Sequence, residues 1–534
     1  AWAKFTGKIA DEVPDNPAME WGRRLEAVVI TINGTFTFQS DENGTAQLAE
    51  FTGSITGNVT AERFVPAKRA FRFLSSPVGN VAIADAWQQQ THITGAQGTV
   101  GQTSANGFDQ TLSGAPSMFT YDHSLPDQIN NDAWLPLTST TQNIEAGKPY
   151  RLFVRGERST IDLSSDPADD ATDVTLSATG TLHTGNFDVE ISDFQGNFTF
   201  VGNPYQAVVD INAINFGADV NDSFIYYWDA SLSDRGAFAT IELPTGTSVS
   251  TTNADEFLRP GQAFFIKNNA SGSDFSIQFN EDDKVTSGSQ TQVFSNENDA
   301  LSLINIRLYT QEAFTTNERE QDAMGLRFST EGNNEIDEKD AVKMFNIDEN
   351  LASLNNNQLL SIENRNLPED QEVIQLITHG YTSDNYIFWL DLQNLPEGTT
   401  AFLKDQYTDE LIALDNGINE IPFNVDSSIE ESSSLFRFTL EFDVDTFSNA
   451  EFESANFKFY PNPVSANLVI NLGQIQAKNT QVNVFDVAGR SLIQTNFKHN
   501  QSELEIDVSK LSAGLYFVEV KEGNKKQTHK IIKK

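Results

Sequence analysis

The sequence predicts an all-β chain made of several β-sandwich domains in series. Apolar and polar residues alternate with a period of two along most of its length, as in residues 436–442 and 504–508. This pattern is typical of strands that bury one face. The alternating segments are short, and clusters of Asn, Asp, Gly and Ser, which favour turns, separate them. Helical periodicity is nearly absent, and the best candidate is the short segment 337–344.

Length and composition narrow the class of protein. At roughly 150 residues per domain, a chain of 534 residues corresponds to about three or four domains. The 75 Asp and Glu residues outnumber the 35 Lys and Arg residues, and a net charge of −40 repels phosphate backbones, so no nucleic-acid partner is expected. The absence of cysteine excludes disulfides, thiol nucleophiles and cysteine-based metal sites.

Residues 1–63 are predicted to be the β-rich end of a preceding domain or repeat. Residues 28–38 alternate as a strand does and contain the turn-forming pair Asn33 and Gly34. The first residues lack the charged and apolar regions of a signal peptide, and no apolar run reaches the roughly 18–20 residues of a membrane span. We therefore expect the chain to be the C-terminal part of a longer precursor.

Residues 64–285 are predicted to form a β domain with an internal duplication. Two segments of the form Phe-x-Phe, each ending in Pro, match position for position. Each is followed by a Trp and then by a Gly-led aromatic strand, so two related β lobes packed together would follow. Chance similarity of short aromatic strands is the alternative. The paired features are residues 71–77 with 198–204, Trp134 with Trp228, and residues 146–153 with 260–266.

Aromatic residues of the same region have two interpretations. They could line a platform for carbohydrate, which would make residues 64–285 a carbohydrate-binding module. We predict that they belong to the core instead, because most of them lie within strand patterns. The residues are Trp87, Phe119, Tyr121, Tyr226, Tyr227 and Trp228.

The second half of the chain divides on composition. A polar segment after Val285 precedes a predicted β-sandwich at residues 295–443. Residues 444–457 are acidic, contain Ser and Asn and show no strand periodicity, which predicts a linker. The last domain is predicted at residues 458–534.

Motifs for catalysis are missing from the sequence. The six histidines show no pairing typical of zinc sites, and no nucleophile elbow, phosphate-binding loop or dinucleotide fingerprint occurs. Chance pairs of carboxylates are inevitable among 75 acidic residues. We therefore assign no catalytic residue and predict that the chain is not an enzyme.

Calcium is the one metal that the composition permits, because it is bound by several oxygen ligands. The candidate ligands are Asp282, Asp283, Asp337 and Asp340, although their spacing does not match an EF-hand. The alternative is that each belongs to a turn whose own backbone amides satisfy its carboxylate. No other cofactor is expected.

Charge sets the last domain apart. Residues 458–534 contain 11 Lys and Arg and 6 Asp and Glu, a net charge of +5, whereas the other 457 residues contain 24 and 69, a net charge of −45. A basic end on an acidic body predicts a separate module with its own partner. The alternative is a solvated lysine tail.

The sharpest motif is Tyr460-Pro461-Asn462-Pro463 at the start of this module. Each proline restricts the residue before it to an extended conformation, which predicts a rigid entry into the first strand. Residues 468–472 then alternate as that strand does.

Turn residues separate the strands that follow. Gly489 can supply a positive φ for a hairpin, Leu511 closes a turn and Gly514 starts a strand. Taken in this order, the segments closely resemble the type A C-terminal sorting domain of the Bacteroidota type IX secretion system. The positions that match its motifs are Tyr460, Pro461, Asn462, Pro463, Asp486, Gly489, Arg490, Leu511, Gly514, Tyr516, Lys530 and Lys533.

The resemblance implies an immunoglobulin-like β-sandwich that directs export through an outer-membrane translocon. The implied partners are this translocon, shuttle and attachment proteins, and a C-terminal signal peptidase that removes the domain. We expect the cleavage between about Asp443 and Phe459, because this stretch is acidic and lacks strand periodicity. The mature protein would be attached at the cell surface or released.

Upstream segments, among them residues 64–73 and 202–206, resemble the region before such sorting domains in large flavobacterial surface proteins, which are often adhesin-like. The leading hypothesis is therefore the C-terminal part of a secreted, surface-anchored adhesin-like protein, with stalk or spacer β domains. One alternative is the non-catalytic end of an exported hydrolase whose catalytic domain lies upstream. The other is the carbohydrate-binding module at residues 64–285, with surface glycans as partners.

Overall fold

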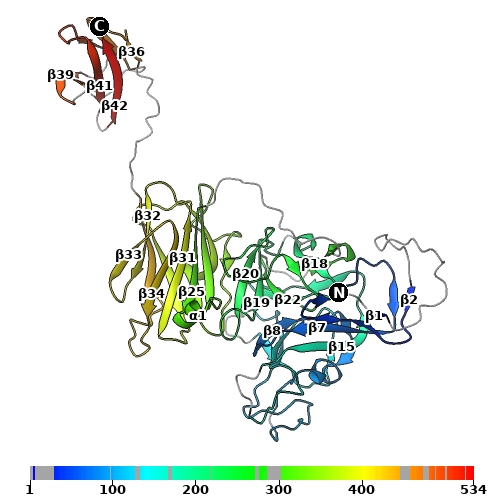
Figure 1. The fold of residues 1–534 in the computed structure, drawn as a ribbon. Helices are drawn as coiled ribbons and strands as arrows, with labels where there is room; N and C mark the ends of the chain where they lie inside the picture. The colour runs from blue at the N-terminus through cyan, green and yellow to red at the C-terminus, as the bar shows by residue number, and fades with distance from the viewer. Residues whose placement is uncertain are drawn as a thin grey trace. The chain divides into compact units, whose positions relative to one another are not determined.

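The computed structural model confirms the all-β prediction (Figure 1). The described part of the chain contains one short α-helix, α1 (Gln311–Thr316), and no helix there is long and apolar enough to cross a membrane. The chain divides into two compact units, Ala1–Asp445 and Thr446–Lys534. The structure describes residues 4–5, 29–96, 98–126, 133–165, 171–217, 219–270, 276–285, 302–444, 458–472, 480–486, 489–498, 502–522 and 525–534.

Two sheets form the first lobe of the larger unit. Val59 and Leu176, on two adjacent strands, point into a core that also contains Phe38. The strand Asn58–Val65 crosses the boundary predicted between residues 63 and 64 and pairs with strand Phe36–Phe38, so both belong to one sheet. The first sheet contains, in strand order, β1 (Lys4–Phe5), β3 (Phe36–Phe38), β7 (Asn58–Val65), β15 (Val174–Leu182) and β9 (Val78–Gly79). The second contains β12 (Trp134–Pro136), β11 (Met118–Tyr121), β14 (Tyr150–Val154) and β8 (Ala70–Leu74).

Small elements complete this lobe. The pairs are β2 (Val29–Thr31) with β6 (Ser54–Thr56), β4 (Ser40–Asp41) with β5 (Gly44–Thr45), and β10 (Val81–Ala82) with β13 (Asn143–Ile144), and the 3-10 turns are η1 (Ile83–Asp85) and η2 (Trp87–Gln89).

The second lobe repeats this plan around an apolar core of its own. Fully buried Ile225 and Phe264 lie on adjacent strands of its main sheet. Its sheets are β17 (Phe198–Gly202), β22 (Ala263–Lys267), β19 (Phe224–Asp229) and β20 (Ala237–Glu242); β16 (Phe187–Glu190) and β23 (Ser276–Phe279); and β21 (Phe257–Leu258), β18 (Val208–Asp210) and β24 (Lys284–Val285), with the turns η3 (Ile211–Ala213) and η4 (Glu281–Asp283).

The two four-stranded sheets have the same strand order, which is the topology that the predicted duplication requires. Strands β8, β11, β12 and β14 of the first lobe match β17, β19, β20 and β22 of the second. The registers correct one detail, because Tyr121 pairs with Trp134 whereas Trp228 pairs with Phe238. Trp134 therefore corresponds to Phe238, and its predicted equivalence with Trp228 is wrong. The two tryptophans lie on different strands of the hairpin, and connections of unequal length hid this in the sequence.

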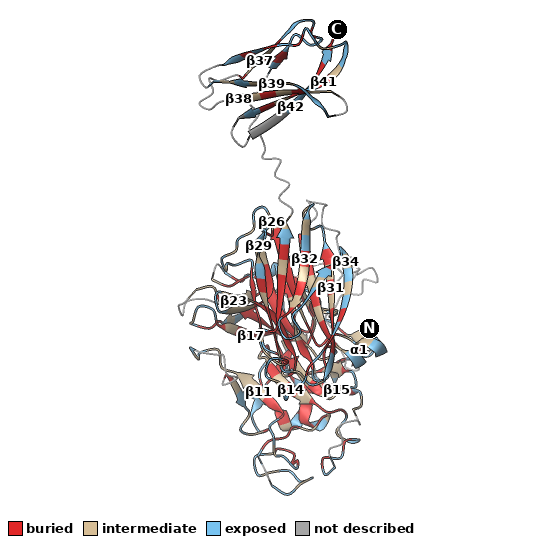
Figure 2. Cartoon of the chain, turned by 90° about the vertical axis from the view of Figure 1, so that its left-hand side faces the viewer, coloured by how far each residue is buried: buried red, intermediate tan, exposed pale blue. Residues whose placement is uncertain are grey.

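Aromatic side chains join the two lobes in one cluster. Buried residues run through the strands of both lobes and of the sheet that follows them (Figure 2). Phe73 of β8 and Phe200 of β17 hold the same position in the two copies, and their rings pack edge to face at 4.8 Å. Contact between equivalent positions is the property of a two-fold interface, here within one chain. The backbone NH of Ser75 also donates to the carbonyl of Gly261 at 3.1 Å across the lobes.

Residues 302–444 form the third lobe, a single large sheet. Ile304 and Leu440 lie on strands far apart in the strand order but share one core, so the sheet folds over on itself as a sandwich. In strand order it contains β33 (Glu410–Leu414), β32 (Thr399–Asp405), β35 (Phe438–Val444), β30 (Val373–His379), β28 (Asn350–Asn355), β29 (Gln358–Asn366), β26 (Asp322–Ser329), β25 (Ser302–Thr310), β31 (Asn385–Gln393) and β34 (Gly417–Asn424), with β27 (Ala341–Val342) paired to β29.

Polar contacts hold the third lobe on the second. Arg327 Nη2 lies 2.7 Å from Glu242 Oε1, and the hydroxyls of Thr240 and Ser361 are 2.9 Å apart. Within the third lobe, Lys343 Nζ donates to Asp322 Oδ1 at 2.7 Å, and both side chains are almost completely buried. The three lobes therefore form one body.

The C-terminal unit is a sandwich of two sheets with a core of its own. Leu468 and Ile470 from one sheet pack against Val482 and Val518 from the other. The sheets are β36 (Lys458–Tyr460), β37 (Asn467–Asn471) and β40 (Glu503–Asp507), and β39 (Ser491–Phe497), β38 (Thr480–Phe485), β41 (Gly514–Glu522) and β42 (Lys525–Lys533).

Candidate functional site

The start of the C-terminal unit closes the edge of its last strand. Asn462 accepts a hydrogen bond from the backbone NH of Ile532 at 2.9 Å and donates its amide to the carbonyl of Lys530 at 3.1 Å. Val464 donates to the carbonyl of Ile532 at 2.8 Å and forms a parallel bridge with Lys533. The motif at residues 460–463 thus lies beside the C-terminal lysines, and Asn462 substitutes for a neighbouring strand along β42.

Tyr460 lies on the outside of the first sheet. Its hydroxyl donates to Glu503 Oε1 at 2.9 Å, and 42% of the residue is exposed. This hydrogen bond to a carboxylate raises the pKa of the Tyr460 hydroxyl. The contact ties the entry segment to β40.

The other predicted positions shape two turns. Asp486 Oδ1 accepts from the backbone NH of Arg490 at 3.0 Å, and Asp486 Oδ2 accepts from its Nε at 2.8 Å, around Gly489 with φ of 76°. At the second turn, the Tyr516 hydroxyl donates to the carbonyl of Ser512 at 2.9 Å. Leu511 packs partly against the core just before β41 begins at Gly514.

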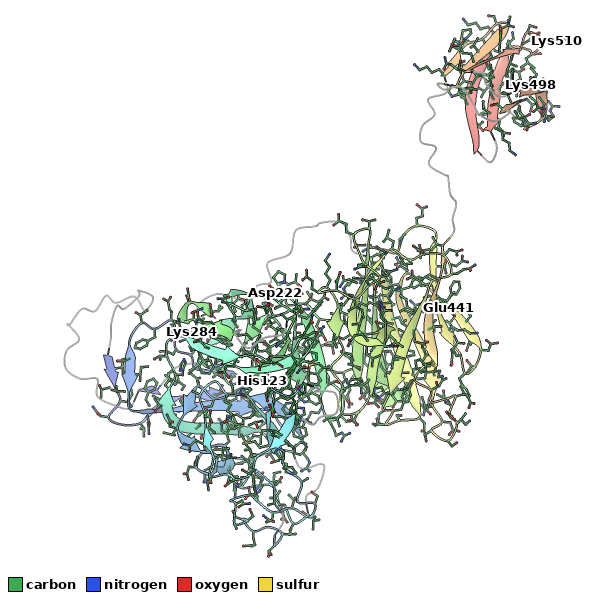
Figure 3. The ribbon with its side chains drawn as sticks, turned by 180° about the vertical axis from the view of Figure 1, so that it is seen from behind. His123, Asp222, Lys284, Glu441, Lys498 and Lys510 are labelled. Atoms are coloured by element: carbon green, nitrogen blue, oxygen red, sulfur yellow. The ribbon has the colours of Figure 1, made fainter. Side chains whose placement is uncertain are left out.

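The structure therefore gathers the predicted motif residues at one strand edge and two turns. Tyr460, Asn462, Asp486 and Tyr516 have hydrogen-bond partners there, and the part of the motif residues in recognition stays a prediction. Lys498 and Lys510 are exposed on the same unit (Figure 3). The pairing of Asn462 with β42 was missed from the sequence, because nothing local links positions that are 70 residues apart.

Two of the carboxylates proposed as calcium ligands, Asp337 and Asp340, accept hydrogen bonds from backbone amides. Asp340 accepts from the NH groups of Asp337 and Asn364, both at 2.8 Å, and burial raises its pKa to about 6. Asp337 accepts from the NH of Lys339 at 2.8 Å. Over the described ranges, no three His, Asp or Glu side chains are grouped as metal ligands would be.

The other pair of calcium candidates lies at η4. Asp283 is buried and accepts from the backbone NH of Asn280 at 2.6 Å, whereas Asp282 is exposed. Burial raises the pKa of Asp283. Calcium binding at either place stays a prediction that the backbone contacts do not favour.

Five of the six aromatic residues offered as a carbohydrate platform belong to the core, as predicted, whereas Phe119 is half-buried outside the core clusters. Trp87, Tyr226, Tyr227 and Trp228 are at most 9% exposed. Tyr121 is half-buried against Trp134, with ring centroids 4.9 Å apart. The four buried rings are therefore not accessible for stacking on a sugar.

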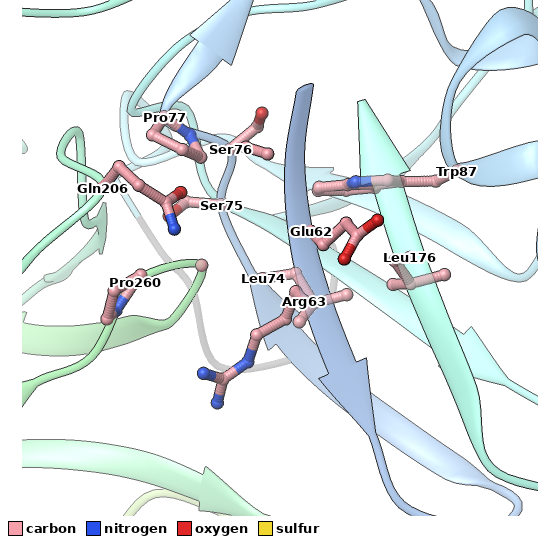
Figure 4. A pocket seen from close by; sticks show the side chains of 12 residues that line it. Glu62, Arg63, Leu74, Ser75, Ser76, Pro77, Trp87, Leu176, Gln206 and Pro260 are labelled. Atoms are coloured by element: carbon pink, nitrogen blue, oxygen red, sulfur yellow. The ribbon is translucent and has the colours of Figure 1, made fainter. Parts of the chain in front are cut away.

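The described part of the larger unit contains at least two hollows. One is a cavity of about 10 Å³ between the lobes, lined by Arg63, Ser75 and Gln206 among others (Figure 4). It has room for about one water molecule. The other is an open groove of about 360 Å³ on the first lobe, lined by Phe64, Gln89, Gln90, Glu157, Ser159, Asp173, Val174 and Thr175.

The comparisons with known proteins agree with this two-part organisation. Residues 458–534 match the secretion system C-terminal sorting domain. The chain is thus a secreted protein, exported across the outer membrane to the cell surface or the extracellular space by the type IX secretion machinery. Residues 25–442 match the domain of unknown function DUF8693, and the chain belongs to this family.

Other comparisons add no function. No curated protein matches the chain. A solved structure described as "Biofilm associated protein - BSP domain" aligns with 88% of this chain and 95% of that one, at 9% identity and a TM-score of 0.11. A likeness this low carries no argument about fold or function.

Proposed function

We propose that the larger unit is the stalk or spacer of an adhesin-like surface protein and that the C-terminal unit is its sorting signal for export. The observation that carries the proposal is that residues 458–534 have a hydrophobic core of their own, separate from the core of the DUF8693 body. A domain with its own core can be recognised as a folded unit and later removed without unfolding its cargo.

The body suits a mechanical role. Its lobes are joined by aromatic packing around Phe73 and by the Arg327–Glu242 ion pair, so they form one block rather than hinged parts. We propose no catalytic activity for it. Steady turnover of polysaccharide or protein substrates by the purified chain would contradict this part of the proposal.

The export role is tested in a bacterium with a type IX secretion system. Deleting residues 458–534 leaves the body folded but retained in the cell, and fusing residues 446–534 to an unrelated passenger delivers the passenger to the surface. The same fusion in a strain without the translocon is the control. A passenger that stays in the periplasm of the competent strain would overturn the proposal.

Partners beyond the machinery as a whole belong to the proposal too. A shuttle or attachment protein and a C-terminal signal peptidase are implied by the sorting-domain resemblance. The expected cleavage site, between about Asp443 and Phe459, lies mostly outside the described residues. Mass spectrometry of surface-released protein tests it, because an intact C-terminus would exclude removal.

A second candidate function is glycan binding at the open groove of the first lobe. The groove has the size of a ligand site. The side-chain oxygen of Gln90 accepts from the backbone NH of Ser177 at 3.1 Å, and one carboxylate oxygen of Asp173 accepts from the NH of Ala67 at 2.7 Å. Amide donors and carboxylate acceptors beside Phe64 suit sugar hydroxyls and a sugar face.

Glycan binding is separable from the stalk role by experiment. The full chain is applied to a glycan array, together with a Gln90→Ala/Asp173→Asn variant that is checked for folding. Loss of a signal in the variant supports the groove, and no signal from the folded wild-type chain rejects it. The complete reading frame decides the alternative of an exported hydrolase. A single catalytic fold upstream would favour the hydrolase, whereas repeats would favour an adhesin-like protein.

A further inference from the structure

The two sheets of the C-terminal unit differ in what they show to solvent. In β37 and β40 the inward residues are Leu468, Ile470, Leu504 and Ile506, so the outward positions include Asn467, Glu503 and Glu505. These outward side chains bind one another: Asn467 donates to Glu505 at 2.7 Å, and Asn471 donates to Glu503 at 2.9 Å. Apart from Val469, this face is polar and acidic, and its side chains hydrogen-bond one another.

The outer face of the second sheet is apolar. Tyr516, Val518 and Val520 of β41 point into the core, so Leu515 and Phe517 lie outside. Phe517 is 36% exposed, and Ile532 on β42 and Leu492 on β39 are each 45% exposed.

The register makes these residues a continuous strip across four strands. Phe517 pairs with Phe485 of β38 on one side and with Lys530 of β42 on the other, and Leu515 pairs with Ile532. Leu492 lies at the bulge opposite Phe485. Soluble monomers seldom leave such a strip in water without a use for it. We call the strip formed by Phe485, Leu492, Leu515, Phe517 and Ile532 the apolar strip.

Lys530 borders the apolar strip, because it occupies an outward position of β42 beside Phe517 and is exposed. Lys521 is exposed at an outward position of β41, four residues beyond Phe517. Glu519, the carboxylate at an outward position of β41, is already hydrogen-bonded by Asn483 at 3.2 Å. Three of the six carboxylates of the unit, those of β40, lie on the other sheet.

We infer that the apolar strip is the surface through which this domain docks on the secretion machinery, and that its partner is a protein surface with an apolar centre and carboxylates around it. The inference rests on the proposed export function and names the face that serves it. Charge complementarity selects the partner: the lysine border attracts an acidic rim, and the apolar centre supplies the burial that holds the complex. The acidic sheet on the opposite side is left free.

The test uses the full chain in a bacterium with a type IX secretion system. Phe517→Thr/Ile532→Thr keeps strand-forming residues and removes the centre of the strip, and Lys530→Glu reverses its border. Surface delivery falls by about tenfold or more in both variants, as expected when central interface contacts are lost, and the protein accumulates in the periplasm. The matched control is Val469→Thr/Glu505→Lys on the outer face of the other sheet, which is delivered as wild type.

Folding is checked in every variant by hydrogen exchange at Ile531, whose side chain is fully buried in the domain core. Wild-type delivery of the folded Phe517→Thr/Ile532→Thr variant overturns the inference, and so does equal loss of delivery in the folded control. A wild-type chain that forms dimers which these substitutions dissociate, or that binds anionic vesicles through Lys530, would also overturn it. If deletion of residues 458–534 does not stop export, the proposed function fails instead.

Discussion

Asn462 accepts a hydrogen bond from the backbone NH of Ile532 at 2.9 Å, although 70 residues separate them. The same side chain donates to the carbonyl of Lys530, so one residue of the entry segment satisfies two backbone groups of the last strand. An edge strand with open backbone groups invites pairing with other chains. The N-terminal segment of the sorting domain covers part of that edge.

Replacing Asn462 with Ala should loosen the C-terminal strand. The loss of two hydrogen bonds lowers the local stability of β42 by about 1–2 kcal/mol. Hydrogen exchange of the peptide containing Ile532 in the full chain measures this as faster exchange. Asn467→Ala is the control, because its side chain binds only Glu505 on an exposed face. Unchanged exchange in Asn462→Ala would show that the backbone bonds of Val464 suffice.

Replacing Phe73 with Ala should destabilise the larger unit by about 3–5 kcal/mol, because a large core side chain leaves a cavity. Its ring is 5% exposed and lies within 6 Å of five aromatic rings, among them Trp134 at 5.6 Å and Trp228 at 5.9 Å. Denaturant unfolding followed by tryptophan fluorescence reports on this contact. Leu112→Ala, at a position 69% exposed, leaves the midpoint unchanged. A small effect of Phe73→Ala would mean that the lobes repack.

Replacing Lys343 with Met should destabilise the third lobe by about 3–5 kcal/mol, because it leaves Asp322 buried without its cation. Burial already raises the pKa of Asp322, and its carboxylate also accepts from the NH of Leu351 at 2.5 Å. The double variant Lys343→Met/Asp322→Asn loses less than the two single variants together. Denaturant unfolding of all four chains gives the coupling, and additive losses would contradict a mutually dependent pair.

Asp340 should make the stability of the larger unit depend on pH. Its pKa is about 6 in the folded chain, above the ordinary value, so the folded state holds the proton more tightly. The resulting stabilisation is complete below about pH 4 and is lost as the pH rises through about 6. The free energy of unfolding of wild type, relative to that of Asp340→Asn, therefore rises by up to about 1 kcal/mol when the pH falls from about 7.5 to about 5. Solvent screening reduces this value. A difference that is constant across this range would contradict the assignment.

Local patterns were enough to predict much of the fold. The Phe-x-Phe segments around Phe73 and Phe200 became equivalent strands, because alternation and the following Pro set both the strand and its end. The core position of Trp87 and Tyr226 followed from their place in apolar segments. Partners brought together by folding could not be read in this way. The NH of Asn364 that binds Asp340, and the edge that Asn462 closes, each come from a distant segment.

The sorting residues show the same limit. Tyr460, Asp486 and Tyr516 were singled out by motif, and the structure supplies their partners in Glu503, Arg490 and Ser512. The apolar strip was missed, although its residues stand at alternating positions. In the sequence, Phe517 and Ile532 look like core residues, and the burial of their neighbours Tyr516, Val518 and Ile531 assigns them to the outer face.

The meeting of Phe73 with Phe200 bears on how this body remains assembled once it has left the cell. A single copy of the repeat would expose its aromatic face, and two molecules would have to find each other to cover it. Such a pair comes apart on dilution, whereas two copies in one polypeptide stay together at any concentration. Joining the copies in tandem thus makes the assembly independent of how far the released protein spreads in its surroundings.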